Sequence, residues 1–423
     1  MTRGVPRLAV VALVVLLVVG SSGCVGVLDG GSEPDDSVDA EADAPAGESG
    51  PDPESGTATD DEPPRAETTA EAAEVLPVDV YRTYDRTRSL VGSDAEKPRV
   101  EVWDMDGLLA DVYDSRQDEF QTALNMTETE IDTTNARGIS YGTHVVVDPN
   151  EGSDADVEQV LVHEYVHAIQ AAEGWYPNSS GIDLETQTAT DYGQVELALV
   201  EGGAVWVTDR YSERYQDEAV RLQSERLAEE YETAPAGDRF FRAPYHYGTA
   251  YVDDRIDDPE DVGEMYENPP ETTEQLLHGL DPDEAPPTDL EVTATTGPAW
   301  SLERDDRLGE LFVRVALESE LDGERAADAA TGWGNDRLLA FEDDDGDRGF
   351  VWTLHWDSAT DADEFEAAFA ESLEERTDEN AEHTTVDRRG EETVVVTVGS
   401  EAFREEVSVT GEGTELEVAV GAE

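Results

Sequence analysis

The chain has 423 residues, of which 102 are Asp or Glu and only 27 are Lys or Arg, so its formal net charge is −75. This charge excludes a nucleic-acid partner, because a phosphate backbone would be repelled at every range that salt does not screen. A wholly disordered polyanion is also disfavoured, since 38% of the residues are hydrophobic, and acid spread over apolar segments is typical of a surface that works in very high salt.

Residues 1–24 are predicted to be a signal peptide. Two arginines precede LAVVALVVLLVV, an apolar run too short to span a membrane comfortably, and SSGC follows it. Cys24 is the single cysteine, so no intramolecular disulfide forms, and it stands where a lipobox cysteine would become lipid-modified. Ordinary cleavage and an uncleaved anchor are the alternatives, because Ser21 stands where that motif favours leucine.

A lipid on Cys24 would hold an exported protein on the outer face of the cytoplasmic membrane. The mature chain would then carry a charge of −77, from 25 basic and 102 acidic residues. Residues 25–74 are rich in Asp, Glu, Ser, Gly, Pro, Ala and Thr, which predicts a disordered acidic tether between the anchor and a folded body.

The folded body is predicted to span residues 75–296. PRVEVWDM (98–105) and RGISYGTHVVVDPN (137–150) favour strands, and the segment between them, from residue 106 to 126, favours a helix. A helix is expected over 154–175, capped by Asp154 or Asp156 and ended by Gly174. A second long helix is expected over 192–231, with a possible break at Gly202–Gly203.

The remainder, 297–423, is predicted to be a small α+β unit. A helix pair leads into strands between residues 308 and 343, a strand, a helix and two further strands follow, and EDDDGDRG (342–349) is expected to form a hairpin turn rather than a calcium loop. The expected fold class is therefore α+β, with a zincin-like helical body, a preceding small β-sheet and this C-terminal unit.

The stretch HEYVH points to a metal site on the predicted helix. His163 and His167 are four residues apart, so their imidazoles face one point. A catalytic zinc takes three protein ligands and leaves one position for water. Glu164 stands beside the pair, where it is placed to take a proton from the activated water and pass it to a leaving amine. A pair of core histidines, or a structural zinc with no open position, are the alternatives.

The third ligand must come from another segment, since no histidine follows at short spacing. Glu201 lies thirty-four residues after His167, within an apolar run and before Gly202 and Gly203. Small residues let two helix backbones approach closely, which a carboxylate needs if it is to reach a metal on a neighbouring helix. Glu196 competes for this role, but its neighbours do not open such room.

These features resemble the glutamate-zincin metallopeptidases and, more narrowly, a family of secreted, predicted zinc metallopeptidases of the haloarchaeal surface lipoprotein type. The motifs that carry the resemblance stand in the family's order: HEYVHAIQ (163–170), VEGGA (200–204), PYHYG (244–248), TEQLLH (273–278) and GWGNDR (332–337). The resemblance covers roughly residues 135 to 370. It implies zinc-dependent peptide hydrolysis, with His163, His167 and Glu201 as ligands and Glu164 as base.

A zinc peptidase also needs a donor to the oxyanion that forms on the attacked carbonyl. Tyr247 in PYHYG and His278 in TEQLLH are the candidates. Packing against Phe240 and Phe241 is the alternative for Tyr247, and capping of a short helix is the alternative for His278.

Three further aromatic side chains are expected to be structural. His246 is predicted to lie in an exposed loop, His144 in the strand before the site helix, and Trp333 in a packing role.

The sequence therefore predicts an exported, membrane-anchored zinc metallopeptidase that hydrolyses peptide or protein substrates outside the cell in high salt. Two other functions remain open. In one, the same fold is a non-catalytic surface lipoprotein that acts as a binding or assembly module. The other is a solute-binding lipoprotein, which fits the tether but leaves HEYVH unexplained.

Overall fold

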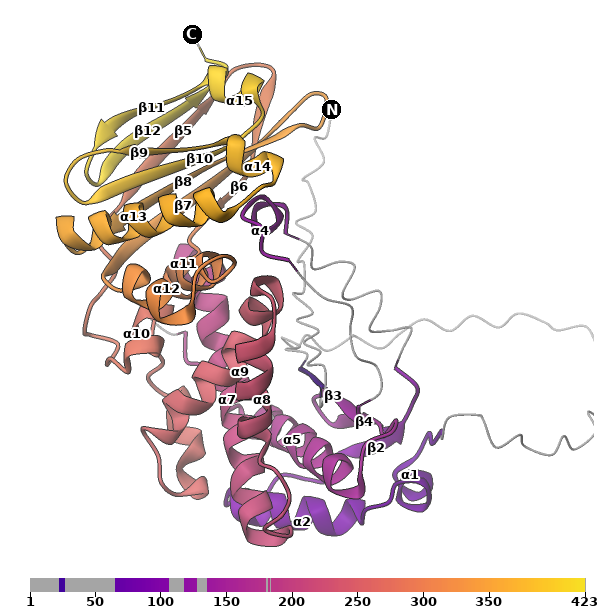
Figure 1. Cartoon of the computed structure of the whole chain (residues 1–423). Helices are drawn as coiled ribbons and strands as arrows, with labels where there is room; N and C mark the ends of the chain where they lie inside the picture. The colour runs from indigo at the N-terminus through magenta and orange to yellow at the C-terminus, as the bar shows by residue number, and fades with distance from the viewer. Residues whose placement is uncertain are drawn as a thin grey trace, which may run out of the picture.

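The computed structural model describes residues 23–26, 65–105, 118–127, 135–179, 182 and 184–422. Its fold class is α+β, as expected: a helical body with a small sheet lies beside a C-terminal unit built on two sheets (Figure 1). The helices of the body are α1 (Thr69–Val75), α2 (Val80–Leu90), α4 (Glu119–Ala123), α5 (Asp154–Glu173), α6 (Leu184–Thr188), α7 (Thr190–Tyr215), α8 (Gln223–Thr233), α9 (Ala236–Asp253), the 3-10 helix η1 (Pro259–Tyr266) and α10 (Thr273–His278).

The small sheet has the strand order β1-β3-β4-β2. Its strands are β1 (Gly23–Gly26), β2 (Arg99–Val102), β3 (Arg137–Tyr141) and β4 (His144–Asp148). The single strand expected over 137–150 is wrong, because the chain turns at Gly142, whose φ of +57° suits glycine, and β3 pairs with β4 as an antiparallel hairpin. His144 begins β4, as expected.

The predicted signal peptide and the predicted tether lie only partly within the described residues. Cys24 lies in β1, which runs parallel to β3 with Cys24 opposite Gly138, while the rest of the predicted signal peptide lies outside the described residues. Most of the predicted tether also lies outside them. Its last part does not match an unstructured linker, since α1 begins at Thr69, is capped by the Thr68 hydroxyl and buries Ala72.

Helix α5 follows the expected range closely. The Ser153 hydroxyl accepts a bond from the backbone N–H of Asp156, and the Asp156 carboxylate accepts one from the Ser153 N–H. This capping box replaces the expected aspartate cap. The helix ends at Gly174, as expected, with a left-handed φ of +69°.

Helix α7 runs through Gly202 and Gly203 without a break and ends at Tyr215. The single helix expected over 192–231 is therefore wrong. A loop follows α7. The Asp209 carboxylate then caps the start of α8 by accepting hydrogen bonds from the backbone N–H groups of Gln223 and Ser224. The side chain on α7 thus supplies a new helix start that sequence periodicity does not reveal.

Helix α9 contains Pro244 and carries His246. The exposed loop expected around His246 is wrong, because its ring is half-buried and stacks on Tyr231 of α8 with ring centroids 4.8 Å apart. Among the described residues, no helix combines the length and the apolar character that crossing a membrane requires.

The C-terminal unit contains a five-stranded sheet, ordered β6-β7-β8-β10-β9, and a three-stranded sheet, ordered β11-β12-β5. Its strands are β5 (Glu291–Thr296), β6 (Trp300–Asp306), β7 (Trp333–Asp343), β8 (Arg348–Trp356), β9 (Thr384–Arg388), β10 (Thr393–Gly399), β11 (Val407–Glu412) and β12 (Glu415–Val420). Its helices are α11 (Gly309–Leu317), α12 (Gly323–Ala330), α13 (Ala359–Glu375), α14 (Glu379–Glu382) and α15 (Glu401–Glu406).

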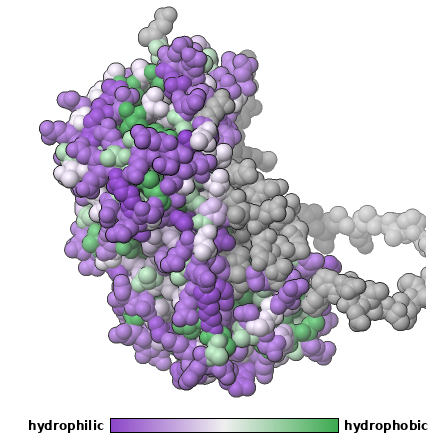
Figure 2. All heavy atoms as spheres, in the orientation of Figure 1, coloured by the Kyte–Doolittle hydropathy of each residue, from purple (hydrophilic) through white to green (hydrophobic). Residues whose placement is uncertain are grey.

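The expected helix pair and hairpin of this unit are confirmed, with β7 and β8 joined by a turn at Gly346. Strand β5 lies before residue 297 but pairs in parallel with β12, so it belongs to the sheet of this unit. Trp333 is a packing residue, as expected: it is fully buried, and its indole N–H donates to Asp336. The face of the molecule in Figure 2 is predominantly hydrophilic, in keeping with the acidic composition.

Candidate metal centre

Helix α5 brings His163, Glu164 and His167 into the protein interior. The relative exposures of these residues are 0%, 0% and 5%. The two imidazole centroids are 4.7 Å apart, as the i, i+4 spacing predicts. Large apolar neighbours on the same helix, including Leu161 and Ile169, anchor it in the core of the body.

Glu201 reaches the two imidazoles from α7. Its Oε2 lies 3.2 Å from His163 Nε2 and 3.2 Å from His167 Nε2, and the residue is fully buried. Together with His163 and His167, Glu201 forms a group that could hold a metal ion, since the ligand atoms of the three residues all lie within 4.8 Å of one another. It is the one such group of His, Cys, Asp or Glu side chains among the described residues. Glu196, the competing candidate, does not belong to this group and is half-buried.

The glycines after Glu201 do permit a close helix approach, but with a different helix from the one expected. A Cβ on Gly202 would lie 2.6 Å from the carbonyl oxygen of Gly248, so α7 packs backbone to backbone against α9. A Cβ on Gly203 would lie 2.5 Å from the Tyr266 hydroxyl of η1. The expectation that these residues bring α7 against α5 is therefore corrected.

The negative charge of Glu201 and the positive charge of His167 stabilise each other in the buried cluster. Burial lowers the pKa of His163, and the hydrogen bond with Glu201 opposes only part of that effect. Burial also acts to lower the pKa of His167, but the charge and hydrogen bond of Glu201, together with the charge of Glu164 and the bond to Gln170, outweigh it and raise that pKa to about 9. Burial acts to raise the pKa of Glu201, but the positive charge of His167 and bonds from both imidazoles lower it to about 2. Glu201 is therefore anionic, and a bound cation would displace a proton from His167.

The second nitrogen of each imidazole faces a glutamine. His163 Nδ1 lies 3.1 Å from Gln223 Oε1, and His167 Nδ1 lies 2.7 Å from Gln170 Oε1. Neither glutamine was predicted from the sequence to be a site residue. The final Gln of HEYVHAIQ was visible in the motif, whereas nothing in the pattern of α8 points to Gln223.

Strand β3 packs directly on Glu164. A Cβ at Gly138 would lie 2.5 Å from Glu164 Cγ and 2.8 Å from its Oε1, so only glycine leaves room for this side chain. Tyr141, on the same strand, has its pKa raised by burial and by the charge of Glu164. This tyrosine is a second feature that the sequence did not identify.

The two candidate oxyanion donors make other contacts. The Tyr247 hydroxyl lies 3.2 Å from that of Tyr231, and the Arg314 guanidinium lies 5.2 Å from the Tyr247 ring centroid. His278 Nε2 lies 2.9 Å from Glu310 Oε1 on α11, which raises the pKa of His278. The partners of these two side chains, Tyr231 and Glu310, thus lie outside the His-His-Glu cluster.

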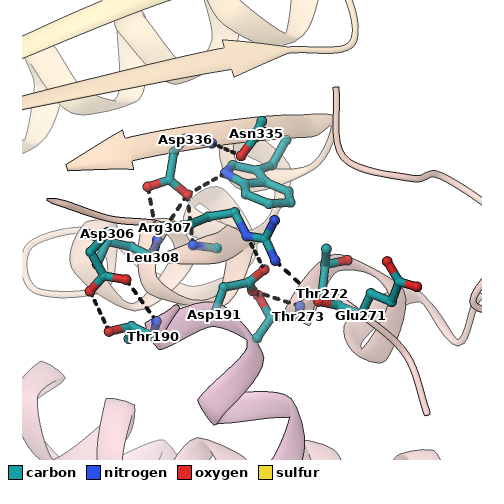
Figure 3. A network of polar contacts seen from close by, with 12 residues as sticks. Thr190, Asp191, Glu271, Thr272, Thr273, Asp306, Arg307, Leu308, Asn335 and Asp336 are labelled. Atoms are coloured by element: carbon teal, nitrogen blue, oxygen red, sulfur yellow. Dashed lines mark hydrogen bonds and ion pairs between the residues drawn. The ribbon is translucent and has the colours of Figure 1, made fainter. Parts of the chain in front are cut away.

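The C-terminal unit anchors the start of α7. The residue before this helix, Ala189, has no capping side chain, and Asp306 of β6 supplies one: its carboxylate accepts from the Thr190 N–H at 2.9 Å and from the Thr190 hydroxyl at 2.7 Å (Figure 3). Asp191 pairs with Arg307 Nε at 3.1 Å and accepts from the backbone N–H and the hydroxyl of Thr273. The helix that carries Glu201 is thus fixed at its first turn by the neighbouring unit.

The residues of the cluster fit a divalent metal with mixed nitrogen and oxygen ligands. Glu201 Oε1 is buried and makes no hydrogen bond within the described part of the chain, which is costly for a carboxylate oxygen unless a cation lies beside it. Two imidazoles and one carboxylate are also the protein ligands of several catalytic zinc sites. The donor set is therefore chemically suited to such an ion.

Comparison with known proteins bears only on the C-terminal unit. A family model described as a domain of unknown function, DUF8575, matches residues 300–423. No curated protein and no solved structure matches the chain.

Proposed function

We propose that the protein is an exported zinc metallopeptidase, anchored through a lipid on Cys24 and acting on peptides or unfolded proteins in a high-salt exterior. The observation that carries the proposal is the convergence of His163, His167 and Glu201 from two helices, with Glu164 beside them. A divalent zinc held by these three residues would supply Lewis acidity that polarises a peptide carbonyl and makes water more acidic.

The chain's own residues then have separate tasks. The Glu164 carboxylate takes a proton from the attacking water and delivers it to the amine nitrogen as the peptide bond breaks. Gly138 leaves the space that this carboxylate occupies. Tyr141 lies close enough to Glu164 for the two to interact electrostatically, which makes its hydroxyl a better candidate than Tyr247 or His278 for a polar contact near the reacting atoms.

A non-catalytic metal centre in a surface binding module is the second candidate. It is favoured by the burial of the cluster, since His163, Glu164 and Glu201 are all 0% exposed. In that case the metal would tie α5 to α7 and contribute to stability, as structural zinc does elsewhere.

One experiment separates the two candidates. The full chain is purified in strong salt, its zinc content is measured by elemental analysis, and hydrolysis of an unfolded protein is compared between wild type and Glu164→Gln. Zinc in both proteins with cleavage by wild type alone supports the peptidase. Zinc in both proteins with cleavage by neither supports the binding module, and a zinc-free wild type refutes the metal centre itself.

A further inference from the structure

The glutamines that face the two imidazoles define which nitrogen each histidine offers to a metal. An amide oxygen only accepts hydrogen bonds, so when a metal occupies the two Nε2 atoms, His163 Nδ1 and His167 Nδ1 carry the hydrogens that these glutamines accept. The orientation of Gln170 is fixed independently, because its Nε2 donates to the carbonyl oxygen of Val200 at 2.9 Å. A metal bound beside Glu201 would replace the hydrogens through which the two Nε2 atoms bond its carboxylate, so each Nε2 would then present its lone pair to the ion.

Gln170 also connects α5 to α7 beside the carboxylate ligand. The Val200 carbonyl that it contacts belongs to the residue immediately before Glu201. Its amide group also lies 2.8 Å from the Tyr266 hydroxyl, which in turn donates to the Leu199 carbonyl. A displacement of the His167 ring would therefore disturb the backbone that carries Glu201.

Gln223 is also held by α7, through Asp209. Its backbone N–H donates to Asp209 Oδ1 at 2.8 Å, and Asp209 lies eight residues, about two turns, after Glu201 on α7. Gln159 of α5 braces the preceding loop, since its Nε2 donates to the Arg221 carbonyl at 2.9 Å. The loop between α7 and α8 is thus shaped so that Gln223 meets His163.

We propose that Gln170 and Gln223 are positioning residues that hold both imidazoles as Nε2 ligands and lock their orientation to α7. This inference rests on the proposed metal site. Both supports are neutral, so a divalent ion bound by Glu201 as the one anionic ligand would keep a net positive charge close to the ligands. A carboxylate in either position would cancel part of that charge and make the imidazole a stronger donor.

The chain contains a matched control for a buried glutamine. Gln275 of α10 is also fully buried, donates to the carbonyl oxygens of Pro282 and Glu284 and accepts from the Glu271 N–H. It has the same chemistry and burial as the proposed positioning residues but contacts no member of the metal cluster among the bonds described. Loss of its amide should destabilise α10 without changing the metal site.

The experiment measures zinc affinity of the full chain in strong salt by competition with a chelating indicator, for wild type, Gln170→Met, Gln223→Met, Gln223→Glu and Gln275→Met. Circular dichroism of the zinc-free proteins checks folding. We expect the first two methionine variants to bind zinc about 10- to 100-fold more weakly than wild type. Gln223→Glu retains an acceptor and should bind at least as tightly as wild type, and Gln275→Met should stay within about 2-fold of it.

A second readout uses wild type alone, so it stands even if a methionine variant does not fold. In the zinc-loaded protein, long-range ¹H–¹⁵N spectra should show a hydrogen on Nδ1 of both His163 and His167. Hydrogens on Nε2, unchanged affinity in both methionine variants, or equal loss in Gln223→Glu and Gln223→Met would overturn the inference while leaving the metal centre intact. A wild type that binds no zinc would instead refute the proposed function.

Discussion

Replacement of Gly202 by alanine tests whether the position of Glu201 depends on the contact between α7 and α9. The new Cβ would lie 2.6 Å from the Gly248 carbonyl oxygen and 2.6 Å from the Thr249 nitrogen. Both are backbone atoms, so neither can rotate away. The partner glycine is equally confined, because a Cβ on Gly248 would lie 2.7 Å from the Ala198 carbonyl carbon.

The size of the effect follows from two opposing terms. Ordinary contact begins at 3.4 Å, so the two helix backbones must separate by more than 0.8 Å, the difference between 3.4 and 2.6 Å, because the Gly248 carbonyl carbon would lie closer still to the new Cβ. Overpacking of this kind costs about 1–3 kcal/mol, and backbone contacts place this site at the upper end of that range. The better helix propensity of alanine returns up to about 1 kcal/mol. We therefore expect Gly202→Ala to lower the free energy of unfolding by about 2 kcal/mol.

The assay is urea unfolding at constant strong salt, together with zinc affinity. Gly193→Ala is the matched control, since Gly193 lies on the same helix and a Cβ there would have no heavy atom within 4 Å. The control should be stabilised by about 0.5–1 kcal/mol and should bind zinc like wild type. A Gly202→Ala protein as stable as Gly193→Ala would refute the reasoning, because it would show that α7 and α9 separate without cost.

Three further predictions concern other parts of the site and its supports. Gly138→Ala should displace the Glu164 side chain and lower hydrolysis at least about 10-fold with zinc content unchanged, as elemental analysis and a peptide assay would show; unaltered hydrolysis would contradict this. Asp306→Ala should lower the free energy of unfolding by about 1 kcal/mol through loss of the α7 cap, measured by urea unfolding, and an unchanged midpoint would count against the cap. Burial and the charges of Glu310 and Asp357 raise the pKa of Glu274 to about 8, so the ionised side chain lowers the stability of the fold increasingly as pH rises from about 4.5 to 8. The free energy of unfolding of Glu274→Gln should therefore exceed that of wild type by on the order of 2 kcal/mol at pH 9 and should equal it at pH 4. A difference that does not depend on pH would disprove the assignment.

The local part of the candidate metal centre could be predicted from the sequence. The two histidines and Glu164 lie within five residues of one helix, and helix geometry alone fixes which of them share a face. Glu201 was reached by a different route, through its apolar context and the family resemblance. The position of this residue beside both histidines is supported by the structure, although the glycines after it make their closest approaches to α9 and η1 rather than to α5.

The errors in the fold have a common physical origin. The break between α7 and α8 and the start of α8 depend on Asp209, a side chain fourteen residues before Gln223. Hydrophobic periodicity continues through such a point and does not report it. The hairpin at Gly142 was hidden for a related reason, since both of its strands are largely buried and only two residues separate them.

Tertiary packing also sets the partners of Tyr247 and His278, and it is the reason that Gln223 could not be found from the sequence. Each of the two chosen residues belongs to a motif, but its partner is set by tertiary packing: Tyr231 of α8 for Tyr247 and Glu310 of α11 for His278. A motif shows that a side chain is constrained, and it does not show which group imposes the constraint.

Helix α7 explains how a site built from separated segments can still be rigid. Its first turn is capped by Asp306 of the C-terminal unit, its middle carries Glu201, and its later turns hold Gln223 through Asp209. Because one rigid element fixes both Glu201, the candidate carboxylate ligand, and the support of His163, a shift of the helix moves both together and preserves their spacing. A change in the C-terminal unit can therefore alter metal affinity only if it bends α7 or shifts it relative to α5, which carries both histidines. This is why Asp306→Ala should affect stability more than zinc binding, whereas Gly202→Ala, which acts beside Glu201 itself, should affect both.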